Sequence, residues 1–172
     1  HGITTTPLQA TAVYASLVNG GKIVKPTLVK IDNKKNHGRL ISEKTSQTVN
    51  RILRKVVTHQ EGTASLADVD GYYVGGKTGT SQNYKYKNQN LNTFISVFPS
   101  QNPKYALLVM LENPKVAKNL VYDYKGMKIK AFRNEAGWNS VFVAGKIIKK
   151  IGPILAINNK DFDYQYVVKK NN

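Results

Sequence analysis

Hydrophobic residues recur at helical spacing in three stretches of the chain. The first follows Thr6 and Pro7, which suit the N-cap and the first helical position, and it stops at a Gly-Gly pair. The second begins after Ser42 as its N-cap and extends to about residue 59. The third covers Trp138–Leu155, and Pro153 is expected to mark its end. The apolar positions that define these three helices are Leu8, Ala12, Ala15 and Leu17, then Val49, Ile52, Leu53, Val56 and Val57, then Val141, Ala144, Ile148 and Ile151.

Residues that favour strands lie between the second and third helices. A connecting loop begins at Gly62-Thr63, and an Asp-Gly turn then leads into a strand over Tyr72–Thr80. The polar stretch Ser81–Asn92 has no apolar pattern and predicts a loop. Thr93–Phe98 and Tyr105–Leu111 are rich in β-forming residues, and the short proline-containing segment between them predicts a hairpin of two antiparallel strands.

The other segments have no periodic pattern. Lys22–Ile31 predicts a short extended segment interrupted by proline, and Asp32–Arg39 a turn or hairpin tip. Asn113–Glu135 is interpreted as irregular. The order helix, helix, three strands, helix predicts an antiparallel sheet with helices packed on it, which is fold class α+β. The aromatic and sulfur side chains of the irregular segment that could make contacts are Tyr122, Tyr124, Met127 and Phe132.

The composition indicates one globular domain. The chain has 172 residues, of which 41% are hydrophobic and 21% charged, so a sizeable core is possible. Its longest apolar run, Ala106–Leu111, is far shorter than the roughly 20 residues of a membrane span. The absence of cysteine excludes disulfides and thiolate nucleophiles. Because the chain begins at His1, we expect a piece of a longer protein, with any anchor upstream.

The net charge of +16 favours anionic partners. Of the 26 basic residues, however, only four are arginine, and they form no cluster with aromatic residues of the kind that reads nucleic acid. A solvated surface rich in lysine is therefore the preferred interpretation, and we expect no nucleic-acid partner. A basic module that binds an anionic polymer, nucleic acid or a membrane surface remains the alternative.

The hexapeptide Gly75–Thr80 carries the candidate chemistry. It reads Gly-Gly-Lys-Thr-Gly-Thr and combines a cation, a hydroxyl and glycines on a predicted strand. At the edge of a sheet, such a strand would offer a charge, a hydroxyl donor and free main-chain groups to a peptide that ends in a carboxylate. The tripeptide alone is weak, since chance predicts roughly 0.1 occurrences in a chain of this composition. A glycine bulge with Lys77 and Thr78 in solvent is the structural alternative.

Several further motifs surround the hexapeptide in a fixed order. They are His1-Gly2-Ile3 with Thr6-Pro7-Leu8-Gln9; Gly62-Thr63-Ala64 with Ala67 and Gly71-Tyr72; Phe98-Pro99 with Asn102-Pro103-Lys104-Tyr105 and Val109-Met110-Leu111; and Gly137-Trp138-Asn139 with Val143-Ala144-Gly145. Together they resemble the C-terminal half of the transpeptidase domain of class B penicillin-binding proteins, most closely the septal cell-division type. The resemblance covers residues 1–157, leaves a polar tail over 158–172, and implies the penicillin-binding/β-lactamase-like fold.

The resemblance implies a reaction and roles for five residues. In that family a serine attacks the penultimate carbonyl of a peptidoglycan stem peptide ending in D-Ala-D-Ala, D-Ala leaves, and an amine from a neighbouring strand captures the acyl-enzyme. Lys77 would support the substrate carboxylate and the proton relay, and Thr78 would bind that carboxylate. Gly76 and Gly79 would leave space for the peptide, and the main-chain N–H of Thr80 would form half of the oxyanion hole. No metal and no cofactor is implied.

The nucleophile of the family lies in a Ser-x-x-Lys motif, which this sequence lacks. Its Ser-x-Asn motif precedes Lys-Thr-Gly, whereas the two matches here, Ser81-Gln82-Asn83 and Ser100-Gln101-Asn102, follow Lys77. We therefore interpret the first match as the start of a loop and the second as a hairpin turn. Without nucleophile and base, the chain alone is expected neither to react with penicillin nor to transfer a peptide.

The resemblance also implies partners and a location for the longer protein. The partners would be the peptidoglycan stem peptide and its lipid-linked precursor, β-lactams, the remaining N-terminal part of the same domain, and cell-division membrane proteins. The location would be the periplasmic face of the bacterial inner membrane, with an N-terminal anchoring helix that lies outside this chain.

Overall fold

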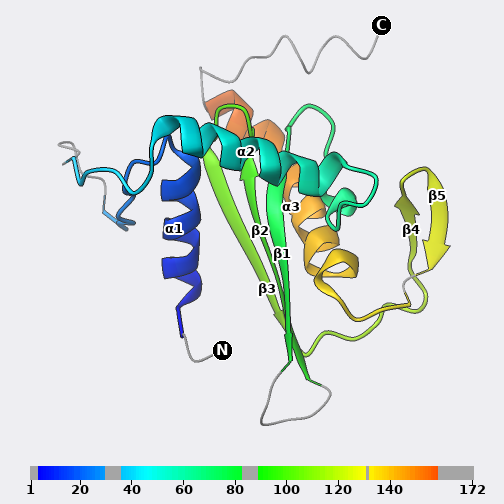
Figure 1. Ribbon diagram of the computed structural model, residues 1–172. Coiled ribbons are helices and arrows are strands. Elements are labelled where there is room, and N and C mark those ends of the chain that lie inside the picture. The colour runs from blue at the N-terminus through cyan, green and yellow to red at the C-terminus, as the bar shows by residue number, and fades with distance from the viewer. Residues whose placement is uncertain (1–3, 30–35, 83–88, 131, 159–172) are drawn as a thin grey trace, which may run out of the picture.

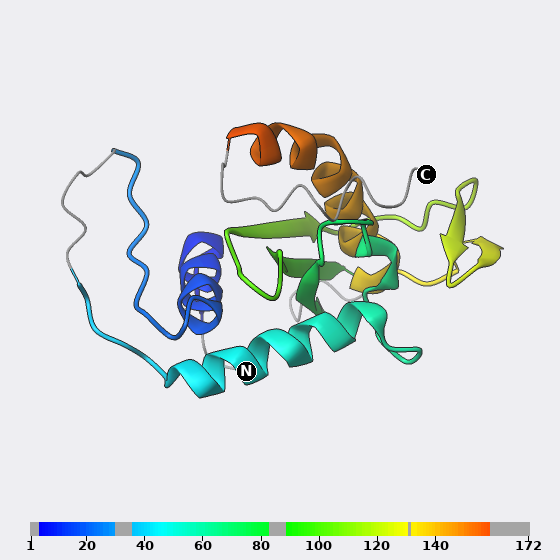
Figure 2. The same cartoon turned by 90° about the horizontal axis from the view of Figure 1, so that it is seen from above.

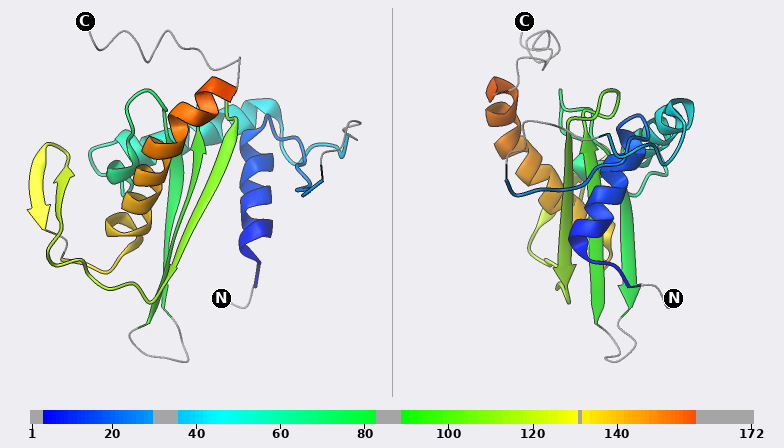
Figure 3. Two further views of the ribbon diagram at one scale, coloured as in Figure 1. Left: turned by 180° about the vertical axis from the view of Figure 1, so that it is seen from behind. Right: turned by 90° about the vertical axis from the view of Figure 1, so that its left-hand side faces the viewer.

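The computed structural model describes residues 4–29, 36–82, 89–130 and 132–158. An antiparallel sheet forms the middle layer, with the C-terminal helix on one face and the two N-terminal helices on the other (Figure 1). The view from above (Figure 2) and the edge-on view (Figure 3, right) show the same three layers. This arrangement confirms the predicted α+β class. Within the described ranges, no helix combines the length and the apolar character needed to cross a membrane.

The two N-terminal helices begin where their capping residues predict. Helix α1 (Pro7–Val18) follows Thr6, whose hydroxyl accepts from the main-chain N–H of Gln9 at 3.1 Å, while the Gln9 side chain accepts from the Thr6 N–H at 2.9 Å. Helix α2 (Glu43–Thr58) follows Ser42, whose hydroxyl accepts a hydrogen bond from the main-chain N–H of Thr45 at 3.1 Å. Both helix predictions are confirmed.

Polar side chains of α2 satisfy the carbonyl groups at the end of α1. The hydroxyl of Ser46 donates to the carbonyl of Leu17 at 2.6 Å, and the amide of Asn50 donates to that of Val18 at 3.1 Å. Both polar residues are buried. The last turn of a helix leaves carbonyls without helical partners, so these bonds fix α2 against α1 at a defined position.

The sheet has three antiparallel strands, β1 (Gly75–Gln82), β2 (Asn90–Phe98) and β3 (Tyr105–Glu112), in the order β1-β2-β3. Alternate residues point to opposite faces. The core cluster on one face includes Phe94 and Phe98 of β2 and side chains of α3 (Ser140–Asn158). A smaller cluster on the other face joins Val97 to Val18 of α1 and Leu53 of α2.

The first strand is shorter at its start and longer at its end than predicted. Tyr72 and Tyr73 lie outside β1, because Tyr73 has a left-handed φ of 48° and its carbonyl accepts from the Ser100 N–H at 2.9 Å. At the other end, Ser81 and Gln82 pair with β2, so the predicted loop over 81–92 is wrong at both of its ends. Residues 83–88 of that loop lie outside the described residues.

The segment predicted as irregular contains a hairpin. Strands β4 (Val121–Tyr124) and β5 (Met127–Lys130) pair antiparallel around Lys125 and Gly126, which have φ of 54° and 80°. Two successive residues with positive φ are typical of tight hairpin turns. The prediction is wrong because the pairing of two four-residue strands across this turn defines the hairpin, and strands this short leave little periodic pattern in the sequence.

The last helix differs from its prediction at both ends. Trp138 lies in a short 3-10 turn, η2 (Ala136–Trp138), and α3 continues past Pro153. The expectation that Pro153 ends the helix is wrong. Ala156 is buried, and the Leu155 carbonyl accepts from the Tyr105 hydroxyl at 3.3 Å. Packing against β3 therefore holds the final turn despite the hydrogen bond that proline removes.

The segment between α1 and α2 contains only an isolated bridge in its described part, between Lys22 and Arg39. The Leu40 N–H donates to the Gly21 carbonyl at 2.7 Å, so the two ends of the segment lie side by side. The predicted extended segment and hairpin tip lie partly in residues 30–35, outside the described residues.

Candidate active site

The Lys-Thr-Gly segment lies on an edge strand. One side of β1 pairs with β2, and its other side has no strand partner in the described part of the chain. The main-chain groups along such an edge can accept an added strand. The alternative, in which the glycines form a bulge, does not hold, because the pairing of Gly75 through Gln82 with β2 is continuous.

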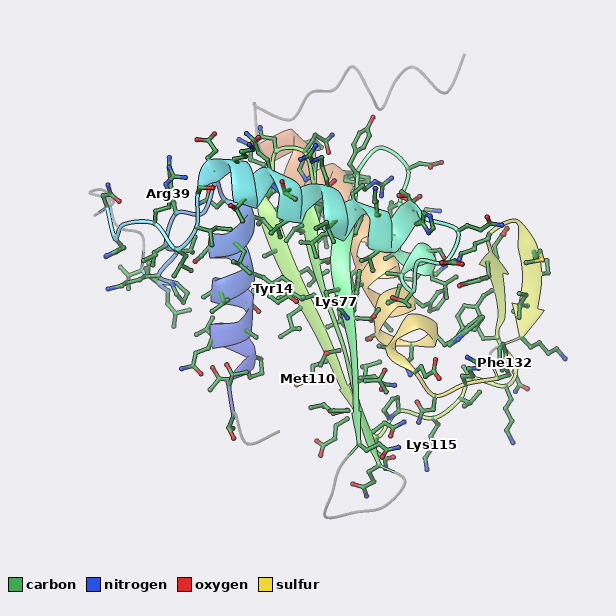
Figure 4. The ribbon with its side chains drawn as sticks, viewed as in Figure 1. Tyr14, Arg39, Lys77, Met110, Lys115 and Phe132 are labelled. Carbon is green, nitrogen blue, oxygen red and sulfur yellow. The ribbon has the colours of Figure 1, made fainter. Side chains whose placement is uncertain are left out.

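Lys77 is exposed in the middle of β1, below α2 (Figure 4). Its Nζ donates to the carbonyl of Thr78 at 2.6 Å, so the ammonium lies close to the strand. The register places Lys77 opposite Ile95 and Thr93 opposite Met110, so Lys77 and Met110 share one face of the sheet. Met110 is also exposed on this face.

Thr78 points to the other face and contacts Thr63, a residue predicted to lie at the start of a connecting loop. The hydroxyl oxygens of Thr78 and Thr63 lie 2.9 Å apart, within hydrogen-bonding distance. Thr63 belongs to the segment between α2 and η1 (Ser65–Ala67). The spacing of Thr63 from the lysine motif is part of the resemblance described above, but only the fold reveals that the two hydroxyls form a pair.

Thr80 uses its side chain to fix the turn that precedes α3. The main-chain N–H of Ala136 donates to the Thr80 hydroxyl at 3.1 Å, and Ala136 is buried. Next to it, a Cβ on Gly137 would lie 2.7 Å from the Thr63 carbonyl oxygen. Turn η2 thus packs closely against both β1 and the segment that carries Thr63.

The two glycines expected to make room for a ligand also have requirements inside the sheet. A Cβ on Gly76 would lie 2.6 Å from the ring of Phe94 and 2.5 Å from the carbonyl oxygen of Ile95. A Cβ on Gly79 would lie 2.6 Å from the hydroxyl of Thr93, which donates to the Gly79 carbonyl at 3.3 Å. Packing against β2 therefore requires glycine at Gly76, where a main-chain oxygen is close, and favours it at Gly79, where only the Thr93 hydroxyl would have to move.

Arg54 of α2 positions the start of β1. Its Nη1 donates to the Val74 carbonyl at 2.7 Å and lies 2.8 Å from a carboxylate oxygen of Asp68. Its guanidinium carbon stands 5.9 Å from the centre of the Tyr73 ring. Since the ion pair is partly exposed, its role is chiefly geometric. It ties α2 to the residues immediately before the lysine motif.

The two Ser-x-Asn matches do not resemble a nucleophile site. Ser100 is only 5% exposed and lies in the turn between β2 and β3. Ser81 is exposed, and its hydroxyl contacts the Leu91 carbonyl at 3.4 Å. Among the described residues, the histidine and acidic side chains do not gather in any group of three that could hold a metal ion.

Several known proteins are similar to this chain in sequence. The model of the penicillin binding protein transpeptidase domain matches residues 1–133. The probable peptidoglycan D,D-transpeptidase FtsI of Caulobacter vibrioides is 31% identical over 93% of this chain and 28% of that protein. Penicillin-binding protein PbpB of Mycobacterium tuberculosis is 32% identical over 80% of this chain and 23% of that protein. The chain thus spans about a quarter of the length of these curated relatives.

The fold is also found among solved structures. The apo transpeptidase domain of penicillin-binding protein 3 from Burkholderia pseudomallei superposes with a TM-score of 0.69 at 23% sequence identity. The superposition covers 95% of this chain and 45% of that one. The described helices and sheet therefore correspond to less than half of that solved chain.

Proposed function

The chain belongs to the penicillin-binding protein transpeptidase family, and on that premise we propose that it is part of a peptidoglycan D,D-transpeptidase of septal cell-wall synthesis. The longer enzyme, called the parent protein below, would cross-link stem peptides that end in D-Ala-D-Ala. The observation that carries this proposal is the free edge of β1, on which Lys77 and Thr78 stand with main-chain groups available beside them.

Each motif residue has a role in this proposal. The ammonium of Lys77 attracts the substrate carboxylate and supports proton transfer, and the hydroxyl of Thr78 donates a hydrogen bond to that carboxylate. Gly76 and Gly79 let the peptide approach the strand. The main-chain N–H of Thr80 supplies half of an oxyanion hole, where one donor contributes about 3 kcal/mol of transition-state stabilisation in comparable sites.

The nucleophile comes from another part of the parent protein, because this sequence has no Ser-x-x-Lys motif. The attacking serine forms an ester with the penultimate carbonyl, the peptide C–N bond breaks, and D-Ala leaves with the proton. An amine of a second stem peptide then displaces the serine. β-Lactams acylate the same serine. The isolated chain is therefore inactive.

The remaining N-terminal part of the domain covers the face of the sheet that carries Lys77. On this face, Met110 of β3 is an apolar side chain left in solvent, with an exposed fraction of 41%. On α1, which packs on the same face, Leu8 and Val13 are also exposed, at 61% and 50%. Exposed apolar side chains of this size are available to an interface. The other partners are the lipid-linked precursor and cell-division membrane proteins, at the periplasmic face of the inner membrane to which an additional helix anchors the parent.

Labelling of the parent protein with a fluorescent penicillin tests this function against the polyanion-binding alternative. We expect covalent labelling whose rate changes little as the salt concentration rises. A module that binds polyanions would show no covalent label, and its affinity for an anionic polymer would fall steeply with salt. No labelling of the parent at any salt concentration would refute the proposed function.

The hydroxyl pair gives a second prediction. Replacing Thr63 with Val keeps the shape of the side chain but removes the partner of the Thr78 hydroxyl. We expect labelling of the parent by penicillin to slow about five-fold, which is the size of one ordinary hydrogen bond. Thr48→Val, an exposed threonine on α2, is the matched control. Equal rates for Thr63→Val and the control would show that Thr63 does not assist Thr78.

A further inference from the structure

Lys125, at the tip of the β4–β5 hairpin, contacts a turn more than 60 positions earlier in the chain. Its Nζ donates to the carbonyl of Gln60 and, at 3.4 Å, approaches the carbonyl of Gly62. Figure 1 shows the hairpin beside the segment that follows α2. A single ammonium thus bridges two carbonyls of the turn that leads directly into Thr63.

The turn itself is tight, and part of its surface is not packed against protein. The Gly62 N–H donates to the His59 carbonyl at 2.8 Å, and a Cβ on Gly62 would lie only 2.4 Å from the Val56 carbonyl oxygen. A hollow of about 520 Å³ adjoins the turn. Its lining residues are Val57, Thr58, His59, Gln60, Ser65, Asp68 and Lys125. Lys125 lines this hollow together with turn residues, so its contacts with the Gln60 and Gly62 carbonyls are well placed to hold the turn.

The hairpin gives Lys125 a fixed base. Tyr122 of β4 is 3% exposed, and its hydroxyl donates to the Trp138 carbonyl at 2.9 Å. Its ring meets those of Trp138 and Phe142 edge-on, at centroid distances of 5.7 and 4.9 Å. Burial raises the pKa of the Tyr122 hydroxyl, so this donor stays protonated. The hairpin is therefore anchored at η2 and α3 while its tip reaches the turn.

A continuous set of contacts connects Lys125 to the motif strand. Lys125 holds the carbonyls of Gln60 and Gly62, Thr63 follows Gly62 in the chain, and the Thr63 hydroxyl pairs with that of Thr78 at 2.9 Å. The Thr63 carbonyl oxygen also packs closely against Gly137 of η2, where a Cβ would lie only 2.7 Å away. A shift of the turn would therefore change the hydrogen bond between the two threonines.

We propose that Lys125 is a positioning residue of the transpeptidase site, which holds the turn over residues 60–62 so that Thr63 orients the hydroxyl of Thr78 toward the substrate carboxylate. The proposal rests on the function proposed above. Lys125 touches no substrate and acts through Thr63. The hairpin, although it forms a separate sheet, is by this account a support for carboxylate recognition.

The test compares penicillin labelling of the parent protein with Lys125→Met, Lys125→Arg and Lys128→Met. Lys128 is on the same hairpin, pairs with Asp123 at 2.9 Å and is 72% exposed, so it is the matched control. We expect Lys125→Met to raise the penicillin concentration for half-maximal acylation rate about five-fold, with the maximal rate little changed, because a lost hydrogen bond has this size. Lys125→Arg should restore most of the affinity, and Lys128→Met should behave as the wild type.

A double-mutant cycle with Thr63→Val separates positioning from general destabilisation. If Lys125 acts through Thr63, Lys125→Met has little further effect once the Thr63 hydroxyl is gone. Equal effects in both backgrounds, or labelling unchanged by Lys125→Met, would overturn the inference while leaving the proposed function intact. Failure of the wild-type parent to label would overturn both. Should Lys125→Met fail to fold, Lys125→Gln takes its place in the test. A five-fold higher penicillin concentration for half-maximal acylation rate would then support the inference, and an unchanged concentration would overturn it.

Discussion

Replacing Lys77 with Met in the parent protein is expected to reduce the rate of penicillin acylation by about 10²- to 10³-fold. The fold places this ammonium on the free edge of β1, next to the main-chain carbonyl of Thr78. Removing one preorganised electrostatic contact from a catalytic site typically costs this much. The acylation rate is measured by following the fluorescent adduct over time at saturating penicillin.

A surface lysine away from the strand supplies the control. Lys115 is exposed in the segment after β3, and Lys115→Met makes the same change in charge and shape (Figure 4). Its acylation rate should stay within about two-fold of the wild type, because single exposed charges contribute little. If Lys77→Met labelled as fast as Lys115→Met, the lysine of the motif would have no part in acylation.

Replacing Phe94 with Ala is expected to have the largest effect on stability, a loss of about 3–5 kcal/mol in the free energy of unfolding. The ring of Phe94 is fully buried in the core between the sheet and α3. It also fills the space beside Gly76, where a Cβ would lie 2.6 Å from the ring. Urea unfolding of the parent protein measures the change.

The same contact predicts that Gly76→Ala alone costs about 1–3 kcal/mol through overpacking. In the Phe94→Ala background the added methyl group enters the vacated space, so Gly76→Ala should cost less there. Relief is partial, since the Ile95 carbonyl oxygen would still lie 2.5 Å away. Gln82→Ala, exposed at the end of the same strand, should change stability by less than about 0.5 kcal/mol. If the losses in unfolding free energy caused by Gly76→Ala and Phe94→Ala were strictly additive, the Phe94 ring would not be the reason that position 76 requires glycine.

The starts of the two N-terminal helices could be predicted from the sequence because their capping residues are local signals. Thr6 and Ser42 act within one helical turn, so their effect depends on neighbours in the chain and not on the rest of the fold. The boundaries that failed depend on tertiary contacts. Tyr73 favours a strand by propensity, yet its carbonyl binds a turn residue after β2 and its φ is left-handed. Pro153 stays within a helix because later residues pack against β3.

The candidate site was predictable only as far as its residues follow one another in the chain. Lys77, Thr78 and Thr80 stand together in the sequence, and a strand places them together in space. Thr63 and Lys125 reach the site from other elements, through contacts that span 15 positions to Thr78 and 65 positions to Gln60. Such contacts are set by how α2, the β4–β5 hairpin and β1 pack together. No local pattern in the sequence encodes them.

The most direct test of the central claim is the structure of the parent protein acylated by penicillin. We predict that the carboxylate of the bound drug accepts a hydrogen bond from the hydroxyl of Thr78, that the ammonium of Lys77 lies beside it, and that the ligand amide runs along the free edge of β1. We also predict that the acylated serine lies outside the 172 residues described by this sequence. An adduct on Ser81 or Ser100, or a drug molecule bound away from β1, would contradict this account.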